Sequence, residues 1–178
     1  MKTINFELST DSIDKAIAEL ERYRKSLETK RDTLLKRLGL LGRDVVAEIM
    51  SGVPEEISRS NNSDYQTDFN VEGGTVIIYL HGDKVAFVEF SAGITYGITG
   101  SEYPTDAGAP YGMGTYNPES DSWRNPNGWW FKDPSNPAAN KYGWVHTWGN
   151  RAYMPMYHAE EAIIIDAVRI AKEVFGGS

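Results

Sequence analysis

The sequence predicts an α+β fold in a single domain covering residues 1–178. Apolar residues recur at helical spacing over about 10–52 and again over about 155–175, while residues 65–91 are rich in β-branched and aromatic side chains. We therefore expect a long amino-terminal helical segment and a carboxy-terminal helix packed on a small antiparallel meander. Residues 93–150 show neither helical spacing nor the alternation of a strand, and they predict a long aromatic-rich loop excursion.

The amino-terminal third predicts a short strand followed by a helix. Thr3–Leu8 alternates apolar and polar residues, and Ser9-Thr10-Asp11 is a typical N-cap cluster. Gly39 and Gly42 interrupt the helical pattern, so we expect two helices or one kinked helix. The apolar positions recur in steps of three, four and seven residues: Ile13, Ile17, Leu20, Leu27, Leu34, Leu38, Leu41, Val45 and Ile49.

The predicted meander contains three strands, or four if the strand of Thr3–Leu8 joins it. Tyr65–Val71 alternates apolar and polar residues, and Gly73-Gly74 turns the chain. Thr75–Phe90 predicts a hairpin closed by Gly82-Asp83, since a leading glycine suits a type II′ turn. In that pairing both faces of the hairpin are largely apolar. A hairpin with one solvent-exposed face would alternate apolar and polar residues along each strand. We therefore expect helices of the chain on one face, and the aromatic loop or a neighbouring subunit on the other.

The aromatic segment from 93 to 150 is too rich in large side chains to be disordered. All five tryptophans of the chain lie in it, and disordered segments are poor in aromatic residues. An ordered excursion packed by its own aromatics is expected. After it, Pro155 suits a first helical position, and Gly176-Gly177 ends the helix. The apolar stripe of that helix is Ala159, Ile163, Ala167, Ile170 and Val174.

Composition excludes several classes of protein. The chain has no cysteine, so it can form neither disulfides nor thiolate metal sites. Its net charge of −7 does not indicate the excess of basic residues that is expected of a nucleic-acid-binding protein. Its first residues lack the apolar core of a signal peptide, and no apolar run approaches the roughly 20 residues that span a membrane. We expect a protein made in a cytoplasm, without a membrane partner.

No residue pattern predicts catalysis, a metal or a cofactor. His81, His146 and His158 have no metal-ligand spacing. Glu89 lies on an apolar face of the predicted hairpin, where a carboxylate must be paired, hydrogen-bonded or shifted in pKa. An anchor for a loop backbone or for an intersubunit arginine is the favoured role. The alternative is a glycoside hydrolase that combines Glu89 with other acids and an aromatic platform: Glu102, Asp106, Glu119 or Asp121.

The aromatic loop has three interpretations: a self-packing segment, a carbohydrate- or peptide-binding surface, or a protein–protein interface. Tryptophan, tyrosine and arginine are enriched where interface energy concentrates, so self-packing combined with an interface is favoured. The residues predicted to serve packing or subunit contact are Phe87, Glu89, Phe90, Trp123, Arg124, Trp129, Trp130, Trp148, Arg151 and Tyr153.

Two short phrases and the order of elements resemble a known family. Ala86-Phe87-Val88-Glu89-Phe90-Ser91-Ala92-Gly93 ends the predicted hairpin, and Gly149-Asn150-Arg151-Ala152-Tyr153-Met154-Pro155-Met156 opens the last helix. The chain resembles the head–tail joining (neck, or tail-completion) proteins of long-tailed double-stranded DNA phages. Their hairpin ends in aromatic-x-Glu-Phe-Gly-Thr-Gly, with Ser91-Ala92 here in place of Gly-Thr, and an aromatic residue and a methionine flank the proline.

The resemblance implies a structural virion protein without a catalytic role. It would form a homo-oligomeric ring in the head–tail connector, beside neighbouring connector and tail proteins, after synthesis in the host bacterial cytoplasm. DNA would pass through the lumen without sequence-specific binding. Two alternatives stay open: a tail-terminator ring, and a glycan-binding or glycan-cleaving virion module that uses the tryptophan-rich loop.

Overall fold

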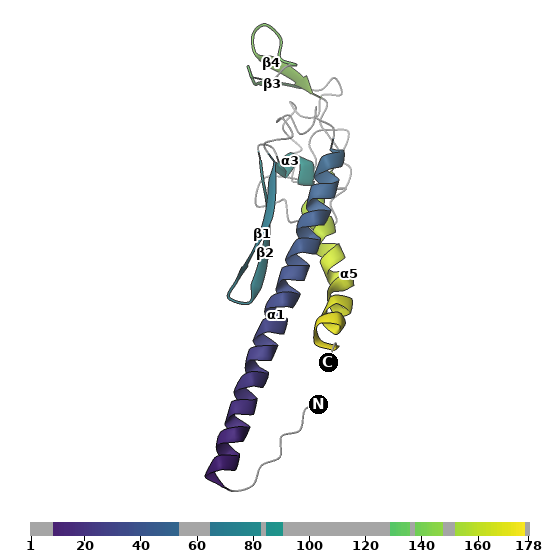
Figure 1. Ribbon diagram of the computed structural model, residues 1–178. Helices are drawn as coiled ribbons and strands as arrows, with labels where there is room; N and C mark the ends of the chain where they lie inside the picture. Colours follow the sequence, from purple (N-terminus) through teal and green to yellow (C-terminus); the bar gives the residue numbers. More distant parts are fainter. Residues whose placement is uncertain are drawn as a thin grey trace, which may run out of the picture.

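The computed structural model describes residues 9–53, 65–82, 85–90, 129–135, 138–147 and 152–176. Their element order is α1 (Thr10–Gly52), β1 (Gln66–Glu72), β2 (Thr75–His81), α3 (Val85–Phe90), β3 (Trp129–Lys132), β4 (Trp144–Thr147) and α5 (Pro155–Gly176). Figure 1 shows the molecule as an elongated body in which α1 lies between the β1–β2 hairpin and α5. The α+β fold class is confirmed. The strand expected at Thr3–Leu8 lies outside the described residues.

Helix α1 is one continuous helix of 43 residues. Ser9 caps it as predicted, because its hydroxyl accepts a hydrogen bond from the backbone N–H of Ser12 at 3.3 Å. The expected kink or break at Gly39 and Gly42 does not occur. Both glycines are buried and allow close approach of other elements.

The two glycines lie against specific side chains of the neighbouring elements. A Cβ atom at Gly39 would lie 2.2 Å from Cδ2 of Phe69, and one at Gly42 would lie 2.1 Å from Cδ1 of Ile78. A Cβ at Gly42 would also lie 2.9 Å from Cδ1 of Ile163. The missing side chains therefore let the hairpin and α5 pack close to the α1 backbone.

Strands β1 and β2 form an antiparallel hairpin around the predicted Gly73-Gly74 turn. Phe69 pairs with Ile78 and Val71 with Val76, and this apolar side is half-buried against α1. The opposite side is exposed and mixed. It consists of Gln66, Asp68, Asn70, Glu72, Thr75, Ile77, Tyr79 and His81. This hairpin therefore has one apolar face against α1 and one solvent-exposed face.

The predicted third strand is wrong: residues 85–90 form the short helix α3. The expected hairpin of Thr75–Phe90, with two apolar faces, does not exist. Helical geometry places Val85, Val88 and Glu89 on one side, at spacings of three and four residues. Val88 and Glu89 are buried there. Contacts with α5 outweigh the β preference of valine and phenylalanine, since β propensity depends strongly on context.

The core lies where the carboxy-terminal half of α1 meets α3 and the first turns of α5. Its buried members are Val46, Met50, Val53, Val88 and Ala159. Half-buried side chains of α1, β2, α5 and the residues just before β1 and α5 pack around them: Val45, Tyr65, Ile78, Leu80, Tyr153 and Met156. One core therefore joins the helices and the hairpin, and it leaves the amino-terminal half of α1 outside.

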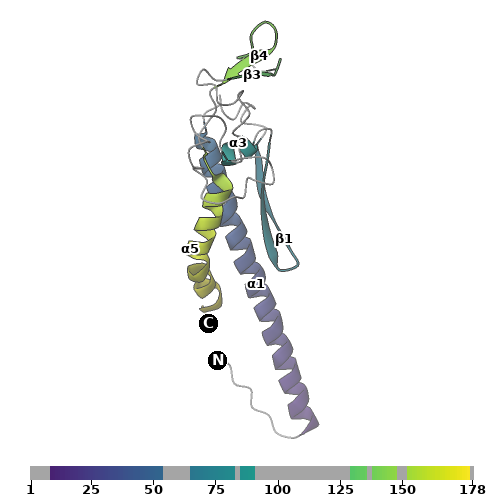
Figure 2. The same ribbon diagram turned by 180° about the vertical axis from the view of Figure 1, so that it is seen from behind.

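The amino-terminal half of α1 projects beyond the rest of the described molecule. In Figures 1 and 2 it extends past both the β1–β2 turn and the end of α5. Nζ of Lys30 donates a hydrogen bond to the carbonyl of Phe175, which marks the level at which α5 ends. Residues 10–29 thus form a helical extension of about 30 Å, at 1.5 Å per residue.

Strands β3 and β4 form a second antiparallel hairpin inside the segment expected to be a loop. Trp130 pairs with His146, and Phe131 pairs with Val145. The turn is organised by Asn140, whose side-chain oxygen accepts hydrogen bonds from the backbone N–H groups of Tyr142 and Trp144. This hairpin lies at the end of the molecule opposite to the α1 extension (Figure 1).

Candidate assembly interface

The two sequence phrases that carry the family resemblance meet in one structural joint. Glu89 of α3 accepts hydrogen bonds from the backbone N–H groups of Met156 at 2.9 Å and of Tyr157 at 3.0 Å. The backbone N–H of Tyr153 donates to the carbonyl of Val88 at 2.8 Å. Segments 67 residues apart in the chain are thereby fixed to each other.

Glu89 supplies a cap that the amino terminus of α5 cannot supply itself. The residue before the helix is Met154, whose side chain has no oxygen, and Pro155 has no N–H to donate. The next two N–H groups need an acceptor, and a carboxylate there is further stabilised by the helix dipole. Glu89 is only 5% exposed. The structure therefore uses Glu89 as an anchor for the backbone at the start of α5, whereas the sequence favoured a loop backbone or an intersubunit arginine as its partner.

Met154 has a backbone conformation that is unusual for a residue with a side chain. Its φ of 53° lies in the left-handed region, which disfavours residues with a Cβ. The backbone N–H of His158 bonds to its carbonyl at 3.0 Å, which begins the helix. Met154 thus stands between Tyr153, whose N–H bonds to the carbonyl of Val88, and Pro155, where α5 begins.

The structure places the predicted packing and interface residues in different environments. Phe87 is 43% exposed, Trp130 is 55% exposed, and Phe90 and Tyr153 are half-buried. Trp129 is the first residue of β3 and pairs with Thr147. The other predicted interface residues (Trp123, Arg124, Trp148 and Arg151) and acids (Glu102, Asp106, Glu119 and Asp121) lie outside the described residues.

The helical extension of α1 carries a row of exposed apolar side chains, which we call the α1 stripe. Its members are between 38% and 55% exposed: Ile13, Ile17, Leu20, Tyr23 and Leu27. They are three or four residues apart, so they share one side of the helix. An isolated exposed leucine is ordinary, but a continuous apolar row indicates a contact surface.

A second exposed apolar surface, the α5 patch, lies on the outer side of α5. It consists of Ile164 at 67% exposure, Ile165 at 76% and Val168 at 63%. Ile163 contacts α1 and Ile170 is buried. Two residues along a helix turn it by about 200°, so Ile165 and Val168 point away from α1.

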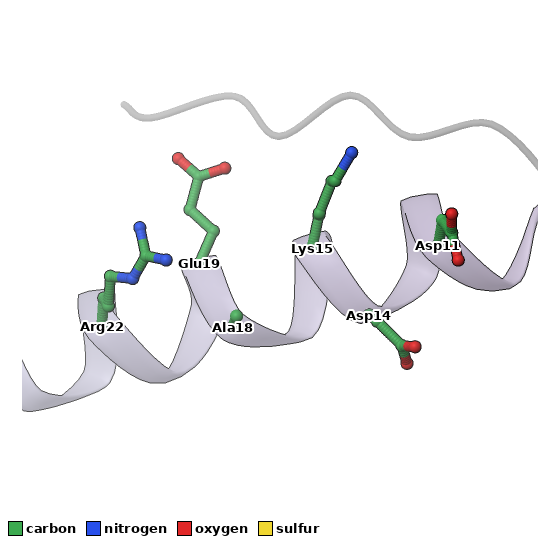
Figure 3. Close-up of a pocket in the computed structure, with 6 residues that line it drawn as sticks. All are labelled: Asp11, Asp14, Lys15, Ala18, Glu19 and Arg22. Carbon is green, nitrogen blue, oxygen red and sulfur yellow. The ribbon is translucent and has the colours of Figure 1, made fainter.

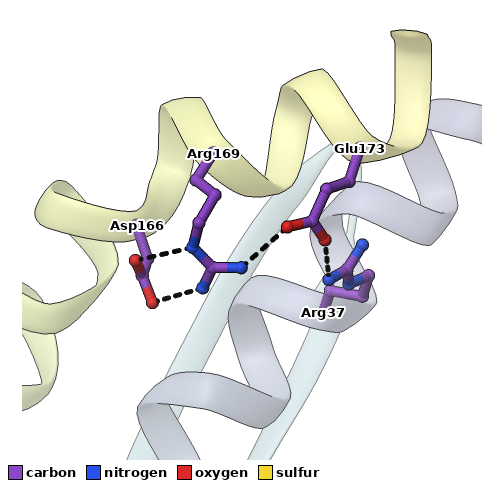
Figure 4. A network of polar contacts seen from close by, with 4 residues as sticks. All are labelled: Arg37, Asp166, Arg169 and Glu173. Carbon is purple, nitrogen blue, oxygen red and sulfur yellow. Dashed lines mark hydrogen bonds and ion pairs between the residues drawn. The ribbon is translucent and has the colours of Figure 1, made fainter. Parts of the chain in front are cut away.

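An ion-pair network fastens the outer end of α5 to α1 (Figure 4). Arg37 of α1 donates to Glu173 at 2.5 Å, and Glu173 also accepts from Arg169 at 2.8 Å. Arg169 in turn donates to Asp166 through two nitrogens. The pKa of Glu173 is lowered by the hydrogen bond from Arg37 and then by that from Arg169, and the pKa of Asp166 is lowered by the hydrogen bond from Arg169.

The remaining polar features of the described ranges are a surface hollow and three separate histidines. A hollow of about 510 Å³ follows one side of the first turns of α1 (Figure 3). It is lined by Ala18 and by five charged side chains of both signs, all on a single helix: Asp11, Asp14, Lys15, Glu19 and Arg22. Within the described ranges, no three histidine or acidic side chains converge on a possible metal position.

The three histidines occupy separate places. His81 ends β2 and lies 5.6 Å from the ring of Tyr79. His146 lies against Trp130 with ring centroids 4.7 Å apart, and His158 is paired with Glu161 at 3.0 Å.

Two elements of the candidate interface were not predicted from the sequence. Four members of the α1 stripe (Ile13, Ile17, Leu20 and Leu27) belong to the predicted helical pattern, but that pattern does not show that α5 ends beside Lys30. The α5 patch had a signal in the sequence, because three consecutive isoleucines, Ile163-Ile164-Ile165, cannot all face one side of a helix. At least one of them had to point outward.

Among the described residues, no helix has the length and apolar character needed to cross a bilayer. No family model, curated protein or solved structure matches the chain.

Proposed function

We propose that this protein is a structural virion component that joins head to tail in a tailed phage or prophage, as part of a ring-shaped connector. The observation that carries the proposal is the joint between Glu89 and the start of α5. The two phrases that resemble the neck family are remote in sequence, and they meet at this joint. The glutamate of the first phrase caps the helix that the second phrase opens.

The exposed apolar surfaces support a role in assembly. The α1 stripe and the α5 patch together leave eight apolar side chains exposed on two helices. Cyclic homo-oligomers cover such surfaces through one repeated contact. Two further parts of the proposal are that the protein has no catalytic role and that DNA passes through the ring without sequence-specific contacts.

Phage particles produced without this protein test the proposed function. We expect particles made without it to accumulate as filled heads and separate tails, and purified protein added to such an extract to restore joined particles. Joined, infectious particles made in its absence would contradict the proposal. Free tails of uncontrolled length would instead identify the tail-terminator alternative, because an uncapped tube continues to grow.

A glycan-binding role is a second candidate, favoured by the exposed aromatic face of the β3–β4 hairpin. Trp130 is 55% exposed, Trp144 is 41% exposed, and Tyr142 of the connecting turn is 68% exposed. Titration of the purified protein with peptidoglycan fragments, followed by tryptophan fluorescence, tests this role. Saturable quenching that is lost in Trp130→Ala would support glycan binding, and product release from the same fragments would contradict the non-catalytic proposal.

A further inference from the structure

The α1 stripe continues the side of α1 that already binds α5. Lys30 and Arg37 both contact α5. Counting back from Lys30 in helical steps of three and four residues leads to Leu27, Tyr23 and Leu20. The stripe therefore lies on the α5-binding side of α1, beyond the point where α5 ends. The partner that fits the stripe is an apolar face of another helix, which would pack on it as α5 packs on the rest of α1.

A second copy of this chain carries such a helix surface. The α5 patch faces away from its own α1 and is between 63% and 76% exposed. We propose that the α1 stripe of one copy packs antiparallel on the α5 patch of the next copy. This inference rests on the proposed function, and it names the partner and the surfaces of the ring. Within one chain α1 and α5 already run antiparallel, as Figures 1 and 2 show.

The charges beside the two surfaces select one register. If Leu20 faces Ile165 in an antiparallel pair, then Ile17 faces Val168 and Arg24 faces Glu161, because the two helices count in opposite directions. That register places an arginine opposite a glutamate at the edge of the apolar contact. It also brings the acidic row of Asp14, Glu21 and Glu28 toward the side of α5 that carries Arg169.

The proposed contact has a definite symmetry. The stripe and the patch are different surfaces, so the interface is heterologous, and each copy provides one of each. Such contacts propagate from copy to copy and close into a ring when the rotation between copies allows it. Antiparallel association of two stripes would instead give an isolated dimer in which the acidic rows of Asp14, Glu21 and Glu28 face each other, and like-charge repulsion disfavours that arrangement.

Complementary interface variants of the full chain test the proposal. Ile17→Asp places a charge in the α1 stripe and leaves the α5 patch intact, while Ile165→Asp places a charge in the α5 patch and leaves the α1 stripe intact. Both side chains are at least 50% exposed, so both variants should fold. By light scattering we expect the wild type to assemble, each variant alone to be monomeric, and an equimolar mixture to form a one-to-one dimer. Ile77→Asp, at an exposed position of β2, is the matched control and should assemble as the wild type does.

Charge reversal tests the register. Arg24→Glu and Glu161→Arg should each weaken assembly about tenfold, and the double variant should recover most of that loss. Dimers formed by Ile165→Asp alone would show that stripes bind each other. A monomeric mixture, a wild type that stays monomeric at every concentration, or charge reversals that do not compensate would overturn the proposal. The head–tail joining function would survive any of these results if particles made without the protein still failed to join.

Discussion

At the scale of the residue, Glu89 has the most specific task in the described molecule. Its carboxylate accepts two backbone hydrogen bonds at the start of α5 while it is almost fully buried. Removing it would leave two N–H groups of α5 without their acceptor, and hydrogen bonds to a charged partner contribute about 1.5–3 kcal/mol each. The residue that was unusual in an apolar strand is thus a helix cap between α3 and α5.

We expect Glu89→Ala to lower the free energy of unfolding by about 2 kcal/mol or more, because a buried cap is lost. Glu89→Gln keeps one acceptor oxygen and should lose less. Urea denaturation followed by circular dichroism measures both effects. Glu48→Ala, on an exposed turn of α1, is the control and should stay within about 0.5 kcal/mol of the wild type. Equal stability of Glu89→Ala and the control would refute the capping role.

Gly39 provides a second prediction at this scale. A Cβ there would meet three ring carbons of Phe69 within 2.7 Å, and overpacking of this kind costs about 1–3 kcal/mol. We expect Gly39→Ala to be destabilising even though alanine favours a helix by about 1 kcal/mol. Gly42→Ala should cost less, since its first obstacle is the flexible tip of Ile78.

Gly52→Ala is the matched control for the glycine series, because a Cβ at Gly52 has open space around it. It should be neutral or slightly stabilising in the same denaturation experiment. If Gly39→Ala were as stable as Gly52→Ala, the close approach of the hairpin to α1 would not exist in solution.

At the scale of the element, we expect the attachment of α5 to α1 to depend on pH. The folded-state pKa values of Asp166 and Glu173 are lowered from ordinary values of 3.8 and 4.5. Lowered pKa values mean that the stabilisation is complete above the unfolded values and is lost as the pH falls through the lower, folded values. We expect stability to decrease between about pH 5 and pH 2.

Glu173→Gln tests the contribution of this network. The variant should be less stable than the wild type at pH 7, and the difference should shrink as the pH approaches 2, because protonation removes the same charge from the wild type. Thermal unfolding at a series of pH values provides the comparison. Two curves that stay parallel throughout would contradict the assigned pKa shift of Glu173.

The two long helices, α1 and α5, were predicted because their signals are local. Ser9 marked the start of α1, Pro155 marked the start of α5, and the apolar spacing covered both helices. The hairpin turn at Gly73-Gly74 was likewise predicted correctly. These features depend on neighbouring residues, so a single sequence contains the information that specifies them.

The errors concern segments whose structure depends on distant contacts. Residues 85–90 have the composition of a strand, and only the α5 terminus that Glu89 caps makes their helix favourable. Gly39 and Gly42 predicted a break because a sequence does not show that Phe69 and Ile78 approach them. The β3–β4 hairpin was missed because its strands have four residues each, too few for a clear alternation.

At the scale of the whole molecule, one body contains the core and one long helix extends away from it. The core joins α1, α3, the first hairpin and α5, while the α1 extension and the outer side of α5 stay exposed. The expectation of a second apolar face on a Thr75–Phe90 hairpin was wrong, because residues 85–90 form α3. The exposed surface belongs to two helices, and the hairpin has only one apolar face.

A reconstruction of the head–tail junction in the intact particle would show whether this protein forms the proposed ring. We expect a ring of copies at that junction in which Leu20 of each copy lies against Ile165 of the next. Finding the chain elsewhere in the particle, or finding both the α1 stripe and the α5 patch exposed to solvent in the assembled copies, would refute the proposed ring.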